Sequence, residues 1–389
     1  MTIIEAAQNL TPHLSELRRE FHRHPEVSGN ESQTADRIVS ELSAIGGYQI
    51  DKNVGGHGVL AVLQGALPGK TVALRADMDA LQINEETGLP FCSETPGVMH
   101  ACGHDNHMTM LLGAARLLAE RKNELPGTVR LIFQPAEELS PKGGSRDMIA
   151  AGALDGVDAV FGLHVWPELP SGTFGVKAGP LMAASDHFSV LIRGKSSHAA
   201  APEEGIDAIT TGAQFISAIQ TIVSRNTDPV KPAVISVGKM RAGTRYNIIA
   251  ETCEMEGTCR TFDPEVRELV AQRLQEVLDG VCHLSGCTGK LKYERGYMSV
   301  YNDPAMADYL HNTAVDLFGR NHAVIVDHPS MCGEDFAYYL AEKPGAFAWL
   351  GTALPQRKTW PLHSCRFDVD ESILWRGSAL LAQLALQFR

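Results

Sequence analysis

Several features that mark specialised classes of protein are absent from this chain of 389 residues. Its 34 lysines and arginines are outnumbered by 46 aspartates and glutamates, so the excess of basic residues that a nucleic-acid partner would require is missing. The sequence has no apolar run long enough to span a bilayer. Residues 1–10 lack the basic start and apolar centre of a secretory signal. We therefore expect no nucleic-acid partner and no membrane partner.

Cysteine pairs with recognisable spacing are also absent, although the chain contains eight cysteines. A long chain without such pairs is typical of a cytoplasmic protein with reduced thiols, which is the location we expect. Most of the cysteines are expected to be small core residues: Cys92, Cys253, Cys282, Cys287, Cys332 and Cys365. Only Cys102 has neighbours that suggest chemistry.

The first half of the chain alternates between strand and helix patterns. No internal repeat is found, and the length favours two domains. Apolar periodicity predicts helices at 10–21, 31–45 and 109–121 and strands at 59–63, 71–76, 129–133 and 159–163. This alternation indicates an α/β fold with a mixed, largely parallel sheet, whose site would lie beyond the carboxyl ends of its strands.

The middle of the chain changes rhythm to β-α-β-β-α-β. Strands are predicted at 187–193, 233–240, 253–261 and 290–295, and helices at 206–223 and 264–284. This order predicts a ferredoxin-like lid domain at 184–296, inserted into a catalytic domain formed by 1–183 and 297–389. Gly179-Pro180 and Gly296-Tyr297 would be its hinges, and the catalytic domain would resume with a helix at 304–318.

The segment from Met99 to His107 (MHACGHDNH) combines one thiol, three imidazoles and one carboxylate. Cys102 and His104 could ligate one metal or lie side by side on a metal pair, because thiolate and neutral imidazole are ligands that zinc-like cations prefer. We expect this segment to lie just before the helix at 109–121.

Glu137-Glu138, His164 and His363 complete the number of donors that a two-metal site needs. One carboxylate of the pair could hold a metal while its neighbour moves protons. Taken singly, the glutamates also fit a solvated pair on a loop, and each histidine fits a hydrogen-bonded structural residue. Only the combination of these residues favours an open hydrolytic site. Their spacing in the sequence does not by itself prove that they converge.

Three polar residues of the predicted lid are candidates for contact with the substrate. His198 could donate a hydrogen bond to a developing oxyanion or be an exposed loop residue. Asn247 and Arg260 could fix a substrate carboxylate, and Arg260 equally fits a structural ion pair. In the catalytic domain, Asp77 and Asp79 could orient metal-bound histidines or cap the turn that follows them.

With these motifs in place, the chain resembles the two-metal peptidase and aminoacylase family. Within it, the resemblance is to the branch of hippurate hydrolases, N-acyl-L-amino acid amidohydrolases and auxin-conjugate hydrolases. The resemblance runs nearly end to end, and the motifs that carry it are 17–26, 74–81, 99–107, 133–138, 162–164, Ser197-His198-Ala199, Asn247, 333–336 and His363. The chain departs from the branch at Ser196-Ser197, where many relatives have glycine residues. It also departs before Gly333-Glu334, where Cys332 stands and others often have Gly and Ser.

This resemblance implies a role for each matched residue. The implied ligands of two divalent ions (zinc, manganese, nickel or cobalt) are Cys102, His104, Glu138, His164 and His363. It implies that Glu137 is the general base and acid, that His198 stabilises the oxyanion and that Asn247 faces the substrate. The implied fold is a zinc-peptidase-like α/β domain with a ferredoxin-like lid, in a homodimer or higher homo-oligomer.

Three functions remain open from the sequence. The favoured one is a metal-dependent amidohydrolase that cleaves small N-acyl-L-amino acids to a carboxylate and a free amino acid. A dipeptidase or aminopeptidase of the same clan would differ in having a pocket for a free α-amino group. A scaffold protein with a degenerate site would have lost a ligand or the base, and none of the six matched positions is lost.

Overall fold

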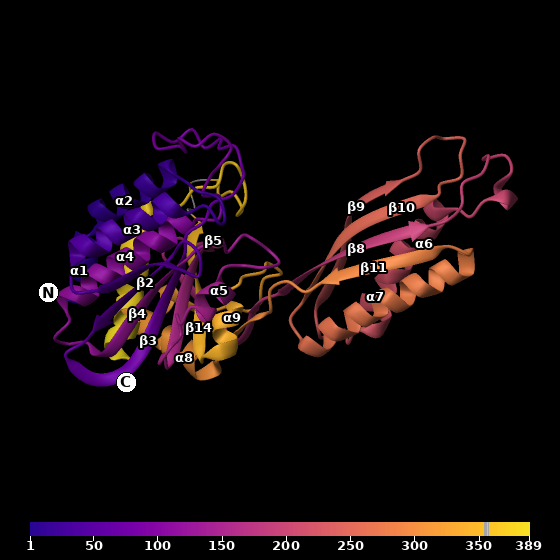
Figure 1. The fold of residues 1–389 in the computed structure, drawn as a ribbon. Helices are drawn as coiled ribbons and strands as arrows, with labels where there is room; N and C mark the ends of the chain where they lie inside the picture. The colour runs from indigo at the N-terminus through magenta and orange to yellow at the C-terminus, as the bar shows by residue number, and fades with distance from the viewer. Residues whose placement is uncertain (354–355, 357) are drawn as a thin grey trace. The chain divides into compact units, whose positions relative to one another are not determined.

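A computed structural model describes residues 1–353, 356 and 358–389 of the chain. It divides into two compact units, which are coloured along the chain in Figure 1. Unit 1 comprises Met1–Leu181, Val300–Pro329 and Asp335–Arg389, and unit 2 comprises Met182–Ser299 and Ser330–Glu334. Nothing in the sequence pattern indicates that the short segment 330–334 belongs to unit 2. The role of unit 2 as a lid stays a prediction.

Unit 1 is built on an eight-stranded sheet of order β1-β2-β4-β3-β5-β14-β6-β13. Its strands are β1 Gln49–Val54, β2 Gly58–Gln64, β3 Leu67–Asp77, β4 Pro126–Gln134, β5 Ala159–Pro170, β6 Phe174–Val176, β13 Ala323–Ile325 and β14 Gly345–Ala353. The pairs β4–β3, β3–β5, β5–β14 and β6–β13 are parallel, whereas β1–β2, β2–β4 and β14–β6 are antiparallel. The mixed sheet confirms the predicted fold class.

Helix α4 (His104–Glu120) is the central helix of unit 1, and all but its last turn is almost entirely buried. Helices α1 (Ile3–Asn9), α2 (Thr11–Arg23), α3 (Ser32–Ile45) and α10 (Leu374–Gln387) pack against it, and Figure 1 shows α1 to α4 together on one side of the sheet. The other helices of unit 1 are α5 (Ser145–Ala150), α8 (Pro304–Phe318) and α9 (Ala337–Glu342). A two-stranded sheet pairs β7 (Gly179–Met182) with β12 (Val300–Asn302).

Unit 2 has an antiparallel sheet of order β11-β8-β10-β9, covered on one face by α6 and α7 (Figure 1). Its elements follow in the order β8 Ala184–Arg193, α6 Ala208–Thr221, β9 Ala233–Ala242, β10 Thr252–Thr261, α7 Pro264–Ser285 and β11 Thr288–Glu294. This is the predicted ferredoxin-like β-α-β-β-α-β succession. Burial alternates along β8 and β10, and their buried side chains pack on the helices as a core separate from that of unit 1.

Two predicted boundaries in unit 1 were wrong, and both affect candidate ligands. Helix α4 begins at His104 rather than at 109, because the polar side chains of its first turn are buried against polar partners and do not follow apolar periodicity. Strand β5 continues to Pro170, so His164 lies inside the strand rather than beyond its end. Its pairing with β14 joins His164 to Trp349, which holds the strand beyond the apolar run seen in the sequence.

Candidate metal centre

The start of α4 and the residues just before it position two of the predicted ligands. Gly103 caps the helix in the left-handed region with φ of 87°. A Cβ atom at this position would lie 2.4 Å from Cγ2 of Val165, so only glycine fits both the backbone and the space. Through this turn, the sulfur of Cys102 and a ring nitrogen of His104 come within 4.8 Å of each other and of a ring nitrogen of His164. The structure thus brings together a thiol and two imidazoles.

One ring nitrogen of His104 is held by a carboxylate and the other is available. Its Nδ1 atom lies 3.2 Å from Oδ1 of Asp79. Its Nε2 atom is buried and has no hydrogen-bond partner among the described residues. A buried polar atom without a partner is costly in a folded protein unless a bound ion or water satisfies it. Nδ1 donation to a carboxylate with Nε2 left open is the arrangement of a metal-ligating histidine.

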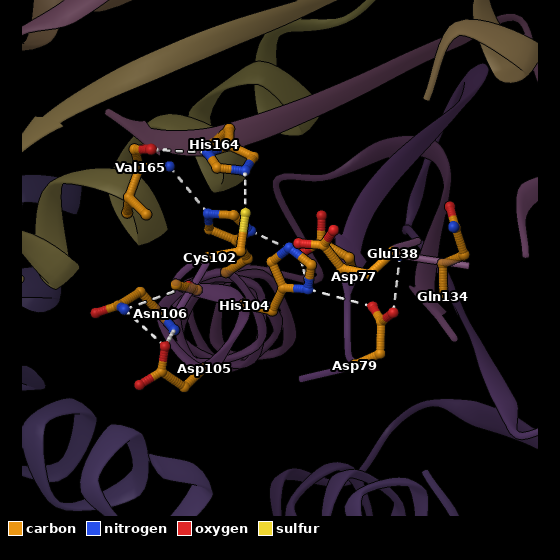
Figure 2. A network of polar contacts seen from close by, with 12 residues as sticks. Asp77, Asp79, Cys102, His104, Asp105, Asn106, Gln134, Glu138, His164 and Val165 are labelled. Carbon is orange, nitrogen blue, oxygen red and sulfur yellow. Dashed lines mark hydrogen bonds and ion pairs between the residues drawn. The ribbon is translucent and has the colours of Figure 1, made fainter. Parts of the chain in front are cut away.

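His164 shows the same division of its ring. Its Nδ1 atom donates a hydrogen bond of 2.7 Å to the backbone carbonyl of Val165. Its Nε2 atom lies 3.4 Å from Sγ of Cys102, and Figure 2 shows the sulfur pointing toward this ring. Strand β5 and helix α4 therefore each bring an imidazole nitrogen close to the sulfur of Cys102.

Glu137 and Glu138 follow β4 on a loop that two buried carboxylates hold. The backbone of Ala136 turns with φ of 58°, and its amide donates a 2.8 Å hydrogen bond to Glu31. The amide of Glu138 donates to Oδ2 of Asp79 at 2.9 Å. Oxygen atoms of both glutamates lie within 4.8 Å of each other and of a ring nitrogen of His104. The loop thus presents two neighbouring carboxylates to one imidazole.

His363 reaches the same cluster from the C-terminal part of the chain. Its Nε2 atom lies 3.0 Å from Oε1 of Glu138, and its backbone amide donates to the carbonyl of Ala101 at 2.8 Å. The residue adopts φ of 64°, a conformation that non-glycine residues rarely hold and that is often found at functional sites. About half of its side chain is exposed, unlike the other predicted ligands.

The charges of the cluster favour a cation. Burial raises the pKa of the Cys102 thiol well above its usual value, and the carboxylates of Glu138 and Glu137 raise it further. Burial lowers the pKa of His104, but Asp77 and Asp79 outweigh burial and raise it to about 10. Without a bound cation, protons are thus retained beside the carboxylates. A metal ion would replace these protons, because it binds thiolate and neutral imidazole.

The donors fall into two overlapping sets that fit two ions. Cys102, His104 and His164 form one set, and Cys102, Glu138 and His363 form the other. A thiolate shared by the sets and a mixture of sulfur, nitrogen and oxygen donors suit borderline transition-metal ions such as zinc. All five predicted ligands therefore lie together in unit 1, as does Glu137, which is 5% exposed.

The remaining predicted residues lie in unit 2. The segments of His198 and Asn247 adjoin, because the amide of Ala199 donates to the carbonyl of Asn247 at 3.1 Å. Arg260 lies on β10, half-buried, and its guanidinium donates to the hydroxyl of Thr258 and to the carbonyl of Cys259. No ion pair of Arg260 with a carboxylate is found among the described residues. The catalytic roles of all three stay predictions.

Supporting residues were harder to find from the sequence. From the sequence, Asp79 fits either an orienting residue or a turn cap, and its contacts with His104 and Glu138 favour the orienting role. Glu31 and Gly103 were not singled out. A buried glutamate at a predicted helix start and a glycine between two ligands were the only signals. His107 was noticed only as part of the histidine-rich segment.

The family model for Peptidase family M20/M25/M40 matches residues 73–387. The N-acetylcysteine deacetylase of Bacillus subtilis is 41% identical over 373 residues, which cover 96% of each chain. Thermostable carboxypeptidase 1 of Saccharolobus solfataricus is 39% identical over 395 residues, covering 100% of this chain and 99% of the relative. The crystal structure of the Bacillus subtilis YXEP protein, described as a dinuclear metal binding peptidase from M20 family, has a TM-score of 0.85 and 38% identity, covering 97% of this chain and 98% of the other.

The family match spans most of the chain, and the similarity to the relatives extends over both units. The part of the chain that the structure describes contains no helix long and apolar enough to cross a membrane. The suspected resemblance is therefore confirmed at the level of the family. The chain belongs to Peptidase family M20/M25/M40 and is a hydrolase that acts on amide bonds.

Proposed function

We propose that this protein hydrolyses N-acyl-L-amino acids to a carboxylate and a free amino acid, using two divalent metal ions. The observation that carries the proposal is the convergence of Cys102, His104, Glu138, His164 and His363, with the buried Nε2 atom of His104 left unpartnered. The deacetylase relative acts on an N-acetyl amino acid by its name, and the YXEP structure is described as dinuclear. Both support the proposal.

The five ligands would divide into the two sets that share Cys102. Bound divalent ions would supply Lewis acidity, which polarises the scissile carbonyl and lowers the pKa of the attacking water. Zinc, manganese, nickel and cobalt all suit such donors, and metal supply contributes to selection among them. Aspartates that orient the histidine ligands would raise their basicity.

Glu137 would be the group that moves protons. It adjoins the ligand Glu138 but belongs to neither set that shares Cys102, and it lies in a buried environment beside His104. It would accept a proton from the attacking water and return it to the leaving amine nitrogen. His198 would donate to the developing oxyanion, and Asn247 and Arg260 would bind the amino-acid carboxylate.

A substrate panel tests the proposal. Chelator-treated protein would be assayed on N-acetyl-L-methionine, hippurate and a set of dipeptides, before and after zinc or manganese is restored. We expect metal-dependent release of amino acid from the acylated substrates and little from dipeptides. Cleavage of dipeptides alone would overturn this proposal and favour a metallo-dipeptidase or aminopeptidase.

A second candidate, carboxypeptidase activity, is favoured by the name of the Saccharolobus relative. An N-blocked dipeptide separates the two functions. Release of the C-terminal residue at a rate above that for N-acetyl amino acids would favour the carboxypeptidase.

The assembly and location complete the proposal. We propose a homodimer or higher homo-oligomer in the cytoplasm, with reduced thiols. Light scattering on the purified protein would give the oligomeric mass, and a monomer at micromolar concentration would contradict the oligomer.

A further inference from the structure

His107 lies beside the proposed ligands but is bonded differently from them. Its ring centroid is 5.4 Å from that of His104 and 4.6 Å from that of His164. Whereas these two histidines each leave Nε2 available, both nitrogens of His107 are occupied. Nδ1 lies 2.6 Å from Oδ1 of Asp77, and Nε2 accepts a 2.9 Å hydrogen bond from the backbone amide of Val165.

These two contacts fix the tautomer of His107. The amide of Val165 is a donor, so Nε2 must be the unprotonated acceptor, and Nδ1 carries the proton donated to Asp77. An Nε2 atom occupied by an amide has no lone pair left for a metal. Asp77 also accepts from the buried guanidinium of Arg75 at 2.6 Å, which holds the carboxylate in place.

The Val165 amide needs this partner because of the sheet topology. The pairing of β3 with β5 ends at Arg75 and Gly162, although β5 continues to Pro170. Beyond Gly162, the strand therefore loses its neighbour on the β3 side, at the residues that carry the candidate ligand His164. The imidazole of His107 takes the place of a strand at this point.

The same peptide segment orients His164. The carbonyl of Val165 accepts from Nδ1 of His164, while its amide donates to His107. In Figure 2, one dashed line joins the Val165 carbonyl to His164 and another joins the Val165 amide to the second imidazole. The carbonyl of Val165 thus holds the His164 ring so that its Nε2 atom lies toward Cys102. A displacement of the Val165 backbone would move this carbonyl and change the orientation of the ring.

We propose that His107 is a positioning residue of the metal centre, which fixes the Val165 backbone and through it directs His164 toward the ion held with Cys102 and His104. This inference rests on the proposed function, since it presupposes ions at the cluster. His107 is not itself a ligand, and it acts by hydrogen bonding alone.

Metal titration of the apo protein tests the proposal. His107→Phe keeps a planar ring but removes both hydrogen bonds. We expect the variant to bind one of two zinc equivalents about 10–100-fold more weakly than the wild type, the range typical for loss of a group that orients a ligand. His107→Gln, whose amide can still donate to Asp77 and accept from Val165, should recover much of the affinity.

A matched control separates positioning from stability. Thr109→Val removes another buried side-chain hydrogen bond of α4, from the Thr109 hydroxyl to the carbonyl of Asp105, which is not a proposed ligand. It should leave both zinc affinities unchanged. The thermal midpoint of each apo protein is measured alongside, because a merely structural His107 would lower it without a selective loss of one equivalent.

Cobalt provides a spectroscopic readout of the same question. The thiolate and d–d absorption bands of Co²⁺-loaded His107→Phe should differ from those of the wild type and return toward it in His107→Gln. Two tight zinc equivalents and an unchanged cobalt spectrum in His107→Phe would overturn this inference alone. Failure of the wild type to bind zinc would instead overturn the proposed function.

Discussion

The Nδ1 atom of His104 lies 3.2 Å from Oδ1 of Asp79, while the other oxygen of the same carboxylate accepts the amide of Glu138 (Figure 2). One buried aspartate therefore holds two of the proposed ligands, one through its side chain and the other through its backbone. It also accepts from the hydroxyl of Ser28 at 2.6 Å. The aspartate has only acceptor atoms, and each of its three neighbours donates to it.

Asp79→Asn should weaken metal binding. The amide group of asparagine would place a donor against one of the donors that now face the carboxylate, so either His104 or Glu138 loses its orientation. We expect the zinc affinity to fall about 10–100-fold in competition with a chelator. Ser28→Ala, which removes only the third contact of Asp79, is the control and should remain close to the wild type. An unchanged affinity in the asparagine variant would show that Asp79 only shapes the turn.

Glu137→Gln should abolish turnover and preserve metal binding. Glutamine has nearly the same shape as glutamate but cannot accept a proton from water, and general base catalysis typically contributes about 10²–10⁴-fold to a rate. We expect kcat on the best acylated substrate to fall by at least this factor, with two zinc equivalents retained. Glu138→Gln is the comparison variant. Because Glu138 is a proposed ligand, this variant should bind metal more weakly than Glu137→Gln. Retained activity in Glu137→Gln would exclude the role proposed for Glu137.

Helix α8 illustrates which elements the sequence could predict. Its bounds, Pro304–Phe318, agree with the prediction because local signals define both ends: Asp303 caps the first turn, Pro304 follows at the first position, and Gly319 ends the helix. Strand β14 was missed for the opposite reason. It is rich in glycine and alanine, which have weak strand propensity, and the parallel sheet that buries it is a non-local feature.

The site shows a similar division. Cys102 and His104 could be suspected from their spacing, since they are only two residues apart. His164 and His363 join the site through contacts between distant parts of the chain, which spacing does not reveal. Their assignment as ligands came from the resemblance to the family. The polar first turn of α4 escaped prediction because burial of His104 and His107 depends on partners in β3, just beyond its end and in β5.

Glu85 should make stability depend on acid pH. Burial raises the pKa of this carboxyl, but hydrogen bonds from His22, from the amide of Ser93 and from Thr87 outweigh burial and lower it from 4.5 to about 2. A lowered pKa in the folded state means that the carboxylate stabilises the fold fully above pH 4.5. This contribution is lost as the pH falls from 4.5 to about 2.

The thermal midpoints of the wild type and Glu85→Gln, compared from pH 7 downward, test this dependence. The wild type should be more stable at neutral pH, and the difference should shrink below pH 4.5 because protonation makes the two side chains alike. A difference that stays constant over this range would show that the charge of Glu85 contributes nothing and that its shape alone matters.

Arg18→Met should destabilise unit 1 strongly. The guanidinium is fully buried, with Nε 2.8 Å from Asp105, and it also contacts Glu371 at 3.1 Å. Its removal leaves the buried carboxylate of Asp105 without its guanidinium partner, with His22 at 2.7 Å as the remaining basic side chain. Breaking a buried ion pair typically costs about 3–5 kcal/mol of unfolding free energy. All four tryptophans of the chain lie in unit 1, so fluorescence during urea denaturation reports on this unit.

The neighbouring Arg19 provides a matched control for this prediction. It binds the same Glu371 at 2.7 Å, but its side chain is 45% exposed. Exposed ion pairs contribute about 0–1 kcal/mol, because water screens the charges and the long side chains lose freedom on pairing. Arg19→Met should therefore change the denaturation midpoint little. Equal effects of the two substitutions would contradict this explanation, because burial is the property that distinguishes the two arginines at their shared partner.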